Sequence, residues 1–411
     1  MTRPETEPPQ ATTCLVAGGG PAGMMLGLLL ARSGVDVTVM EKHADFLRDF
    51  RGDTVHASTL RLLDELGLGA AFAALPHRMI ESVNATVQDT PVQIDLRRLP
   101  GPHKHIALVP QWDFLELLAT AAEAEPGFRL LRSTEVLGPV EERGKVVGVR
   151  YRDATGEHVL RADLTVACDG RASTLRAAAG LTPRSFGAPM DVWWFRVPRR
   201  DGDPHGLNGI FQSGHGCALI DRGDYFQVAY LIRKGADTQM RAEGIESLQR
   251  QLVTLVPWLA DRVSTLTSFD DVKLLDVQLN RLRRWYVDGL LFIGDAAHAM
   301  SPIGGVGINL AVADAVATAR ILAEPLRTHT VHTRHLARIQ ARRWLPAALI
   351  QRVQRTVQDR AIAVAIGPDA TMATAPRAVK IANRIPALRT AVAYGVAIGP
   401  LPEHAPAQTR R

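Results

Sequence analysis

The chain has 411 residues, of which 46% are hydrophobic and 22% charged, so it can bury the core of two domains or of one large domain with an embedded subdomain. Its three cysteines lie too far apart for a zinc knuckle, a CxxC redox pair or a disulfide framework. The N-terminal leader lacks an apolar stretch, and runs such as 26–31 are too short to span a bilayer, which predicts a cytoplasmic protein with no transmembrane segment and no metal site.

The net charge of +6 is unevenly distributed along the chain. Residues 331–411 hold 13 Lys or Arg and three Asp or Glu, a net charge of +10, so the remainder carries −4. This basic tail suits an anionic partner such as a phosphorylated cofactor, a lipid surface or an acidic carrier protein, although a solvated Arg-rich helix face is the simpler interpretation. Its only aromatic residues are Trp344 and Tyr394, so nucleic acid is not expected. The sequence leaves open a monomer or a homodimer.

The chain opens with a βαβ pattern in "CLVAGGGPAGMMLGLLLARSGVDVTVMEK", residues 14–42. Within it, Gly18, Gly20 and Gly23 satisfy the spacing G-x-G-x-x-G. These glycines allow a tight turn in which backbone N–H groups approach a pyrophosphate at a helix N-terminus. The expected elements are a strand over 14–17, a helix over 24–32 that Pro21 precedes, and a second strand over 35–40.

An acidic residue follows the second expected strand. Glu41 lies 23 positions beyond Gly18, where a carboxylate can accept hydrogen bonds from ribose hydroxyls. A carboxylate at this place disfavours a 2′-phosphate, so the pattern predicts FAD or NAD, and not NADP, as the resident dinucleotide.

The choice between FAD and NAD rests on "GLLFIGDAAHAMSPIGGVGINL", residues 289–310. Its apolar run 290–293 predicts a strand, and Asp295 follows at the carboxyl edge, where a ribityl hydroxyl is a natural partner. Pro302 and three glycines then form a loop without bulky side chains, and the loop leads into a helix that begins near Ile308 or Asn309. A flat ring can lie on such a backbone, and the helix N-terminus would stabilise an anionic reduced flavin. An NAD dehydrogenase does not need this device, so FAD is favoured.

With these motifs the chain resembles the single-component FAD-dependent aromatic hydroxylases, the flavoprotein monooxygenases that include para-hydroxybenzoate hydroxylase. The resemblance extends over 13–330 and includes a third motif, "CDGRASTLR", around Asp169 and Gly170. It implies that Arg51 lies beside the flavin, that Gln111 binds the ribityl chain, and that Asp169 assists both FAD and NAD(P)H. Taken alone, Arg51 would more simply be a surface ion pair and Gln111 a helix cap.

The motifs and the resemblance together define an expected site in which the flavin itself performs the chemistry. The residues expected at the catalytic centre are Arg51, Asp295 and Pro302. The residues expected to bind the cofactor are Gly18, Gly20, Pro21, Ala22, Gly23, Glu41, Lys42, Arg51, Gln111, Asp169, Gly294, Asp295, Pro302, Gly304, Gly305, Gly307, Ile308 and Asn309.

Residues 183–284 change character and read as strands, with a hairpin turning at 221–224. Together with 81–96 they predict a mixed sheet packed over the FAD domain, and the resemblance implies that this sheet roofs the substrate pocket. Strand alternation hides half of the side chains on the other face, so each candidate is more simply a core or solvent-facing residue. The substrate candidates are Trp193, Phe195, Gln212, His215, Tyr225 and Tyr230.

The predicted fold is α/β: a Rossmann-like FAD-binding domain with an embedded mixed β-sheet substrate domain and C-terminal helices. Two Arg-rich helices are expected over 336–363 and 377–399. The expected division is a FAD-binding domain over 12–75, 105–180 and 285–330, a substrate domain over 76–104 and 181–284, and a helical segment over 331–411.

These features predict a FAD-dependent monooxygenase of secondary metabolism. NADPH or NADH would reduce the flavin transiently, and O2 would then form a flavin C4a-hydroperoxide that hydroxylates or epoxidises an electron-rich aromatic or polyketide-like small molecule. Three alternatives stay open: a flavin reductase or oxidase, a halogenase, whose W-x-W-x-I-P signature residues 193–198 partly match, and a non-redox FAD-holding protein. His56 and His298 are more simply structural than catalytic residues.

Overall fold

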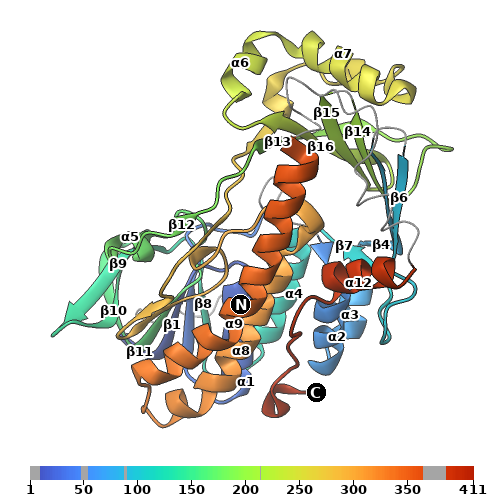
Figure 1. The fold of residues 1–411 in the computed structure, drawn as a ribbon. Helices are drawn as coiled ribbons and strands as arrows, with labels where there is room; N and C mark the ends of the chain where they lie inside the picture. Colours follow the sequence, from blue (N-terminus) through green and yellow to red (C-terminus); the bar gives the residue numbers. More distant parts are fainter. Residues whose placement is uncertain (1–9, 48–53, 88–89, 213, 364–385) are drawn as a thin grey trace, which may run out of the picture.

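The structure is a computed structural model that describes residues 10–47, 54–87, 90–212, 214–363 and 386–411. It has the expected α/β architecture, with two large sheets stacked along the molecule and helices on the outer faces of both (Figure 1). The first sheet carries the glycine motif, and the second is the mixed sheet expected from residues 81–96 and 183–284.

The first sheet has eight strands, and its central path runs in the order β19-β20-β11-β1-β2-β8. The five strands from β20 to β8 are parallel, as in a doubly wound fold, whereas β19 and the β9–β10 hairpin are antiparallel. The strands are β1 (Ala11–Ala17), β2 (Val37–Met40), β8 (Phe128–Leu131), β9 (Glu135–Glu142), β10 (Lys145–Asp153), β11 (Gly156–Ala167), β19 (Tyr286–Val287) and β20 (Leu290–Phe292).

Four helices pack against this sheet or against one another: α1 (Pro21–Arg32), α4 (Gln111–Glu123), α8 (Gly307–Arg327) and α9 (Thr333–Val357). Every residue of α1 from 22 to 31 is buried, so its apolar side chains form the centre of the core. Among the described residues, the segment Ile303–Arg327 is long and apolar enough to cross a membrane by length and composition. Buried neighbours surround 78% of that apolar window, which is the environment of a core helix.

The second sheet has seven strands in the order β17-β13-β16-β15-β14-β5-β6, and it is mixed because β14 and β5 are parallel. The hairpin between β15 and β16 turns at 221–224, as expected from the sequence. Helices α6 (Asp237–Ala242) and α7 (Ile245–Leu255) cover its outer face (Figure 1). The strands are β5 (Ser82–Val87), β6 (Thr90–Asp95), β13 (Met190–Pro198), β14 (Leu207–Gln212), β15 (His215–Asp221), β16 (Tyr225–Arg233) and β17 (Lys273–Leu275).

Small elements connect the two large sheets. A three-stranded sheet in the order β3-β7-β4 lies beside the second sheet, and a two-stranded sheet pairs β12 with β18. The small elements are β3 (Thr54–Val55), α2 (Ala57–Glu65), α3 (Gly69–Ala73), β4 (Arg78–Ile80), β7 (Ile106–Leu108), α5 (Thr174–Ala178), β12 (Arg184–Ser185) and β18 (Asn280–Arg281).

The C-terminal segment is helical and then returns along the first domain. Helix α9 continues as a π-helix, η6 (Gln358–Ile362), and α12 (Pro386–Ala397) follows; the beginning of the second expected helix, 377–385, lies outside the described residues. The last residues cross α1 and α2, where the Arg32 guanidinium donates to the Thr409 carbonyl and Arg411 pairs with Glu125.

Candidate functional site

The carboxyl ends of four parallel strands meet at one edge of the first sheet. Ala17 at the end of β1 is in register with Met40 of β2 and Ala167 of β11, and Ala167 is in register with Phe292 of β20. The turns that follow these strands therefore lie side by side, although they are far apart in the sequence. Open α/β sheets bind their ligands at this edge. The residues brought together there are Gly18, Glu41, Asp169 and Gly294.

The first turn requires glycine at positions 18 and 23. Gly18 adopts φ +106°, and a Cβ placed there would lie 2.5 Å from the Cys168 carbonyl oxygen. A Cβ on Gly23 would lie 1.9 Å from the Gly18 carbonyl oxygen. Gly20 differs, because its φ is −74° and a Cβ there would meet nothing within 4 Å. Gly20 is the N-cap of α1 and no side chain caps this helix, so the turn exposes first-turn amides to an anionic ligand.

The Glu41 carboxylate closes this turn from the second strand. Its Oε2 accepts the Gly19 N–H at 2.9 Å and its Oε1 accepts the His43 N–H at 3.1 Å. Glu41 is buried, whereas the neighbouring Lys42 is exposed. A carboxylate oxygen can accept more than one hydrogen bond, so Glu41 suits both the turn and the hydroxyls of a ribose.

The second turn follows β20 and carries the other half of the site. Gly294 adopts φ +59°, and its N–H donates to the Asp314 carboxylate of α8 at 3.1 Å. The Asp295 carboxylate beside it is about one third exposed and accepts from Arg171 Nε at 3.0 Å. Asp295 therefore lies at the sheet edge, where a cofactor hydroxyl can reach it.

The loop from Pro302 to Gly307 leads directly into α8. Gly304 and Gly305 have φ of +78° and +61°, and a Cβ on Gly305 would lie 2.3 Å from Thr54 Oγ1. A Cβ on Gly307 would meet nothing within 4 Å. Helix α8 begins at Gly307, just before the expected start at Ile308 or Asn309, and no side chain caps it. The loop therefore presents bare backbone and an uncapped helix N-terminus, as a flat anionic ring requires.

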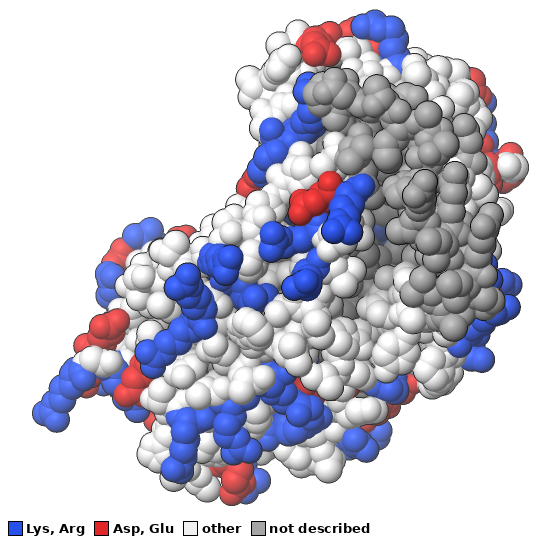
Figure 2. All heavy atoms as spheres, in the orientation of Figure 1, with Lys and Arg blue, Asp and Glu red and all other residues white. Residues whose placement is uncertain are grey.

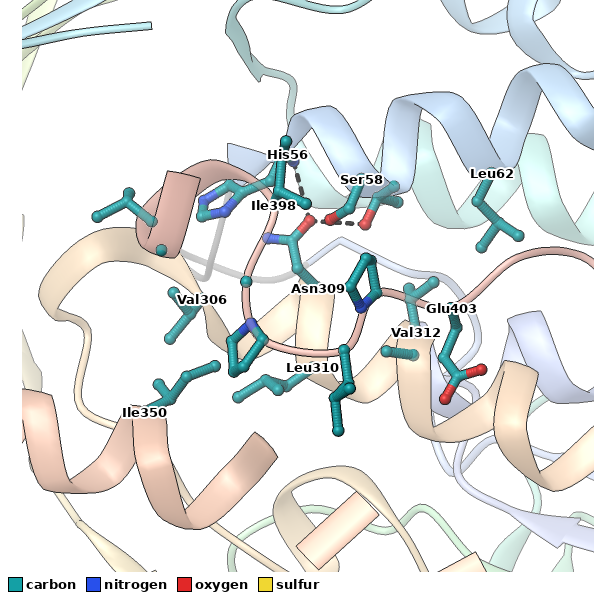
Figure 3. Close-up of a pocket in the computed structure, with 18 of the residues that line it drawn as sticks. His56, Ser58, Leu62, Val306, Asn309, Leu310, Val312, Ile350, Ile398 and Glu403 are labelled. Carbon is teal, nitrogen blue, oxygen red and sulfur yellow. Dashed lines mark hydrogen bonds between the residues drawn. The ribbon is translucent and has the colours of Figure 1, made fainter. Parts of the chain in front are cut away.

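The Asn309 side chain fastens this loop to the segment before α2 (Figure 3). Its Oδ1 accepts the His56 N–H at 2.9 Å and the Thr59 hydroxyl at 2.7 Å. Its Nδ2 donates to the carbonyl oxygens of Thr54 and Gly305, at 3.1 and 3.2 Å. The sequence predicts that Asn309 binds the cofactor, but its amide group is occupied by protein contacts, so its side chain holds the loop and only its backbone is left for a ligand.

The third motif supplies an acceptor that lacks a protein partner. Asp169 Oδ2 accepts the Leu175 N–H at 3.2 Å, while Oδ1 is buried and bonded to no group in the described part of the chain. Burial raises the pKa of this carboxyl above its ordinary value. An orphan acceptor between the two turns is the polar group that a cofactor hydroxyl would satisfy. Gln111 is the first residue of α4 and is half-buried, and Arg51 lies outside the described residues.

The two faces of the second sheet have different neighbours. Cross-strand pairing puts Trp193 beside Tyr230 and Phe195 beside Val228, and all four belong to the core cluster that contains Leu252 of α7. This is the outer face of the sheet, so the geometry does not support the substrate contacts expected of Trp193, Phe195 and Tyr230. His215 lies on the same face, where its Nδ1 is 2.7 Å from the Tyr230 hydroxyl, and Gln212 pairs with it.

The inner face of the second sheet faces the loop from Pro302 to Gly307. Met190 of β13 and Ile362 form a small buried cluster, against which pack Leu231 of β16 and Ile303, the residue that follows Pro302. By strand alternation Trp194 and Tyr225 belong to this face. Trp194 lies among apolar side chains, and its buried Nε1 has no hydrogen-bond partner in the described chain. The sequence predicts Trp193 as a substrate residue, whereas the tryptophan on the face that turns toward Ile303 is Trp194.

A buried ion cluster behind the Gly294 turn was missed by the sequence reading. Asp314 is fully buried and contacts Arg343 Nε of α9 at 2.8 Å and His298 Nε2 at 2.6 Å. Burial raises the pKa of the Asp314 carboxyl, but His298 and Arg343 outweigh burial and hold it below its ordinary value. The sequence signal that could have revealed this cluster is Asp314 itself, a single acidic residue among the apolar residues of α8. Within the described ranges no group of three or more potential ligands suits a metal ion.

Comparisons with known proteins agree with this geometry. Residues 11–353 match the family model described as "FAD binding domain". The chain is 35% identical to "6-methylpretetramide 4-monooxygenase" of Streptomyces rimosus, over 96% of this chain and 94% of that protein. It is 27% identical to "Dialkyldecalin synthase" of Streptomyces rugosporus, over 74% of this chain and only 63% of that protein.

A solved structure confirms the architecture. The anhydrotetracycline hydroxylase OxyS from Streptomyces rimosus superposes with a TM-score of 0.76 at 24% identity, over 96% of this chain and 77% of that one. The two glycine turns, the orphan carboxylate and the long match to a monooxygenase lead to one assignment: the chain belongs to the FAD binding domain family and is a FAD-dependent monooxygenase.

Proposed function

We propose that this enzyme hydroxylates a polycyclic aromatic small molecule of tetracycline-type secondary metabolism, with NAD(P)H as reductant and O2 as co-substrate. The observation that carries the proposal is the 35% identity to 6-methylpretetramide 4-monooxygenase over 96% of the chain. The apolar inner face formed by Met190, Leu231 and Trp194 supports it, because a fused-ring substrate needs an apolar surface beside the flavin loop.

The residues of the chain bind the cofactor and protect the reaction. The uncapped N-terminus of α1 would hold the pyrophosphate, and Glu41, Asp169 and Asp295 would accept from ribose and ribityl hydroxyls. FAD held by these residues would supply the two-electron chemistry that links NAD(P)H to O2. One oxygen atom converts a substrate C–H bond into C–OH, and the other leaves as water. Ile303 and the apolar inner face would exclude water from the ring.

The experiment that tests this function is a screen of polycyclic phenols for accelerated NAD(P)H consumption, with mass spectrometry of the products. A product heavier by one oxygen atom is expected. NAD(P)H consumption that yields only hydrogen peroxide with every compound would make the chain an oxidase. A yellow protein that never consumes NAD(P)H would overturn the proposal in favour of a non-redox role, as the likeness to a dialkyldecalin synthase allows.

The halogenase alternative has little support from the site. Its W-x-W-x-I-P signature would align with Trp193, Phe195 and Val197, which lie in the core between the second sheet and α7. These side chains are on the outer face of the sheet, away from Ile303. The partial match therefore reflects the packing of a strand, and a halogenated product in the screen with chloride or bromide present would contradict this interpretation.

Trp194 is expected to contact the substrate, because its Nε1 is an unpaired donor on the inner face. Trp194→Phe keeps an aromatic ring but removes the N–H donor together with part of the ring volume, so we expect KM for the substrate to rise about three- to tenfold, as the loss of a hydrogen bond and of some contact predicts. The measurement is a comparison of KM and kcat with those of the parent enzyme.

Trp193→Phe is the matched control. Trp193 Nε1 donates to Asp237 Oδ1 at 2.6 Å on the outer face, so this variant should lower the melting temperature and leave KM unchanged. If both variants had the parent KM, the substrate would not touch Trp194.

We also propose that the basic tail binds an acidic carrier protein, which would dock on α9. Lys and Arg side chains gather on the face along which α9 runs (Figure 2), and Arg352 and Arg355 are exposed there. Arg343 is buried and Arg342 pairs with Glu403, so these two serve the fold. Only a carrier-bound substrate should then have a KM that depends on salt concentration.

A further inference from the structure

A chain of buried ionic contacts connects the C-terminal segment with the Gly294 turn. Glu403 Oε1 lies 3.6 Å from Arg343 Nη1, and Arg343 Nε donates to Asp314 Oδ1 at 2.8 Å. Asp314 Oδ2 in turn accepts the Gly294 N–H at 3.1 Å. The side chains of Glu403, Arg343 and Asp314 are between 0% and 2% exposed, so water does not screen these contacts.

Glu403 is also the centre of the ionic contacts made by the C-terminal segment. Its carboxylate accepts from Arg342 at 2.7 and 2.9 Å and from Arg320 at 2.8 Å. These arginines belong to α9 and α8, the two helices that carry Arg343 and Asp314. The Glu403 carboxylate therefore links α8 and α9 close to the buried pair of Asp314 and Arg343.

Each member of the chain depends on the next because buried charges must be compensated. Without Glu403, Arg320 and Arg342 lose their shared acceptor and Arg343 loses a nearby anion, so that the Arg343 guanidinium has Asp314 as its only close anion among the described residues. Any shift of Arg343 moves Asp314, which holds the Gly294 amide in its left-handed conformation. Gly294 directly precedes Asp295, the carboxylate placed to receive the ribityl chain.

We propose that Glu403, Arg343 and Asp314 are positioning residues for FAD: they hold the Gly294–Asp295 turn in its cofactor-binding conformation from the end of the chain, without touching the cofactor. The proposal rests on the proposed FAD site and extends it to residues that lie outside all three sequence motifs. It makes the C-terminal segment a functional part of the flavin site as well as a cover for the first domain.

Glu65 provides a matched control for simple anchoring of the C-terminal segment. Its carboxylate accepts from His404 Nδ1 at 2.5 Å and from the Ala405 N–H at 2.7 Å, so it holds the residues next to Glu403 against α2. Among the described residues, no hydrogen bond or ion pair joins Glu65 to Arg343 or Asp314. Loss of Glu65 therefore weakens the attachment of the segment without breaking the path to Gly294.

The test compares FAD release from the holoenzymes of the parent, Glu403→Gln and Glu65→Gln, followed by the rise in flavin fluorescence after dilution. Coupling through a buried network is typically worth a factor of about ten, so we expect the Glu403→Gln dissociation constant for FAD to rise about tenfold. Glu65→Gln should stay within about twofold of the parent at a similar loss of melting temperature. Equal FAD affinities for the two variants would overturn the inference.

A conservative variant keeps the test decisive where Glu403→Gln does not fold. Glu403→Asp keeps the negative charge on a shorter side chain. If only the charge mattered, its FAD affinity would stay within the twofold range expected for Glu65→Gln. Because the proposal depends on the geometry of the network, we expect FAD affinity to fall about threefold or more. An unchanged affinity would reject the proposal. A parent enzyme that bound no FAD at all would instead contradict the proposed function, so the two failures are distinguishable.

Discussion

Replacing Gly20 with alanine is expected to weaken FAD binding on the order of 100-fold, about 2.7 kcal/mol, while the apoprotein remains as stable as the parent. A Cβ at Gly20 meets no protein atom within 4 Å, and φ −74° suits any residue, so the free chain tolerates the change. Gly20 is the N-cap of α1, and there the methyl group would stand between the helix amides and a pyrophosphate. FAD affinity and the apoprotein melting temperature are the two measurements.

Two glycines of the same chain serve as controls for this separation. Gly23→Ala should lower the stability of the apoprotein itself, because its Cβ would lie 1.9 Å from the Gly18 carbonyl oxygen. Gly395→Ala in α12 should leave FAD affinity unchanged, because a Cβ there also meets nothing within 4 Å, and should raise the stability of the apoprotein by about 0.5–1 kcal/mol, because alanine is the better residue inside a helix. Full FAD affinity in Gly20→Ala would mean that the pyrophosphate lies elsewhere.

The first glycine turn was predictable because its determinants are local. A strand, three glycines and a helix start lie within one short stretch, and steric limits at Gly18 and Gly23 leave one backbone conformation. The Gly294 turn was predictable for the same reason. Their meeting at one sheet edge followed from the rule that parallel strands place their carboxyl ends together, which the register of Ala17, Ala167 and Phe292 confirms.

The residues that could not be assigned depend on contacts between distant elements. Alternation along β13 separates Trp193 from Trp194, but it does not say which face meets α7 and which meets Ile303. Arg343 likewise looks like one more cation in a basic tail, and only the packing of α9 on α8 shows that it is 1% exposed and paired with Asp314. Charge patterns report composition, whereas burial is decided by tertiary packing.

Asn309 illustrates a third kind of difference between sequence and structure. It lies at the start of α8, in the loop that the sequence predicts to bind the cofactor, but its side chain bonds Thr54, His56, Thr59 and Gly305. A polar residue in a binding motif can thus serve the ligand indirectly, by fixing the loop that meets it. The neighbouring His56 also fixes this loop, and its protonation should have a measurable effect on the free energy of unfolding.

Acid is expected to destabilise the protein through His56. This side chain is 2% exposed beside the cofactor loop, and burial lowers its pKa to about 4, even though the nearby carbonyl groups of Val396 and Gly304 raise it. Above pH 6.5 the imidazole is neutral in both the folded and the unfolded chain, so it has no effect. As the pH falls from 6.5 to 4, the unfolded chain binds a proton that the folded chain excludes, and the free energy of unfolding drops by about 3 kcal/mol.

His56→Gln removes this titration while keeping a polar side chain of similar reach. Urea unfolding of the apoprotein at a series of pH values should therefore show a shallower decline between pH 6.5 and 4 for the variant, whatever its stability at pH 7.5. His205→Gln is the control, because the His205 side chain is 82% exposed and its replacement should leave the slope unchanged. If the free energy of unfolding of His56→Gln fell with pH as steeply as that of the parent, the proton would bind to another group. The His56 backbone N–H donates to Asn309, which holds the cofactor loop, so a shift of His56 on protonation of its ring should raise FAD release from the parent holoenzyme over the same pH range, and less so in the variant.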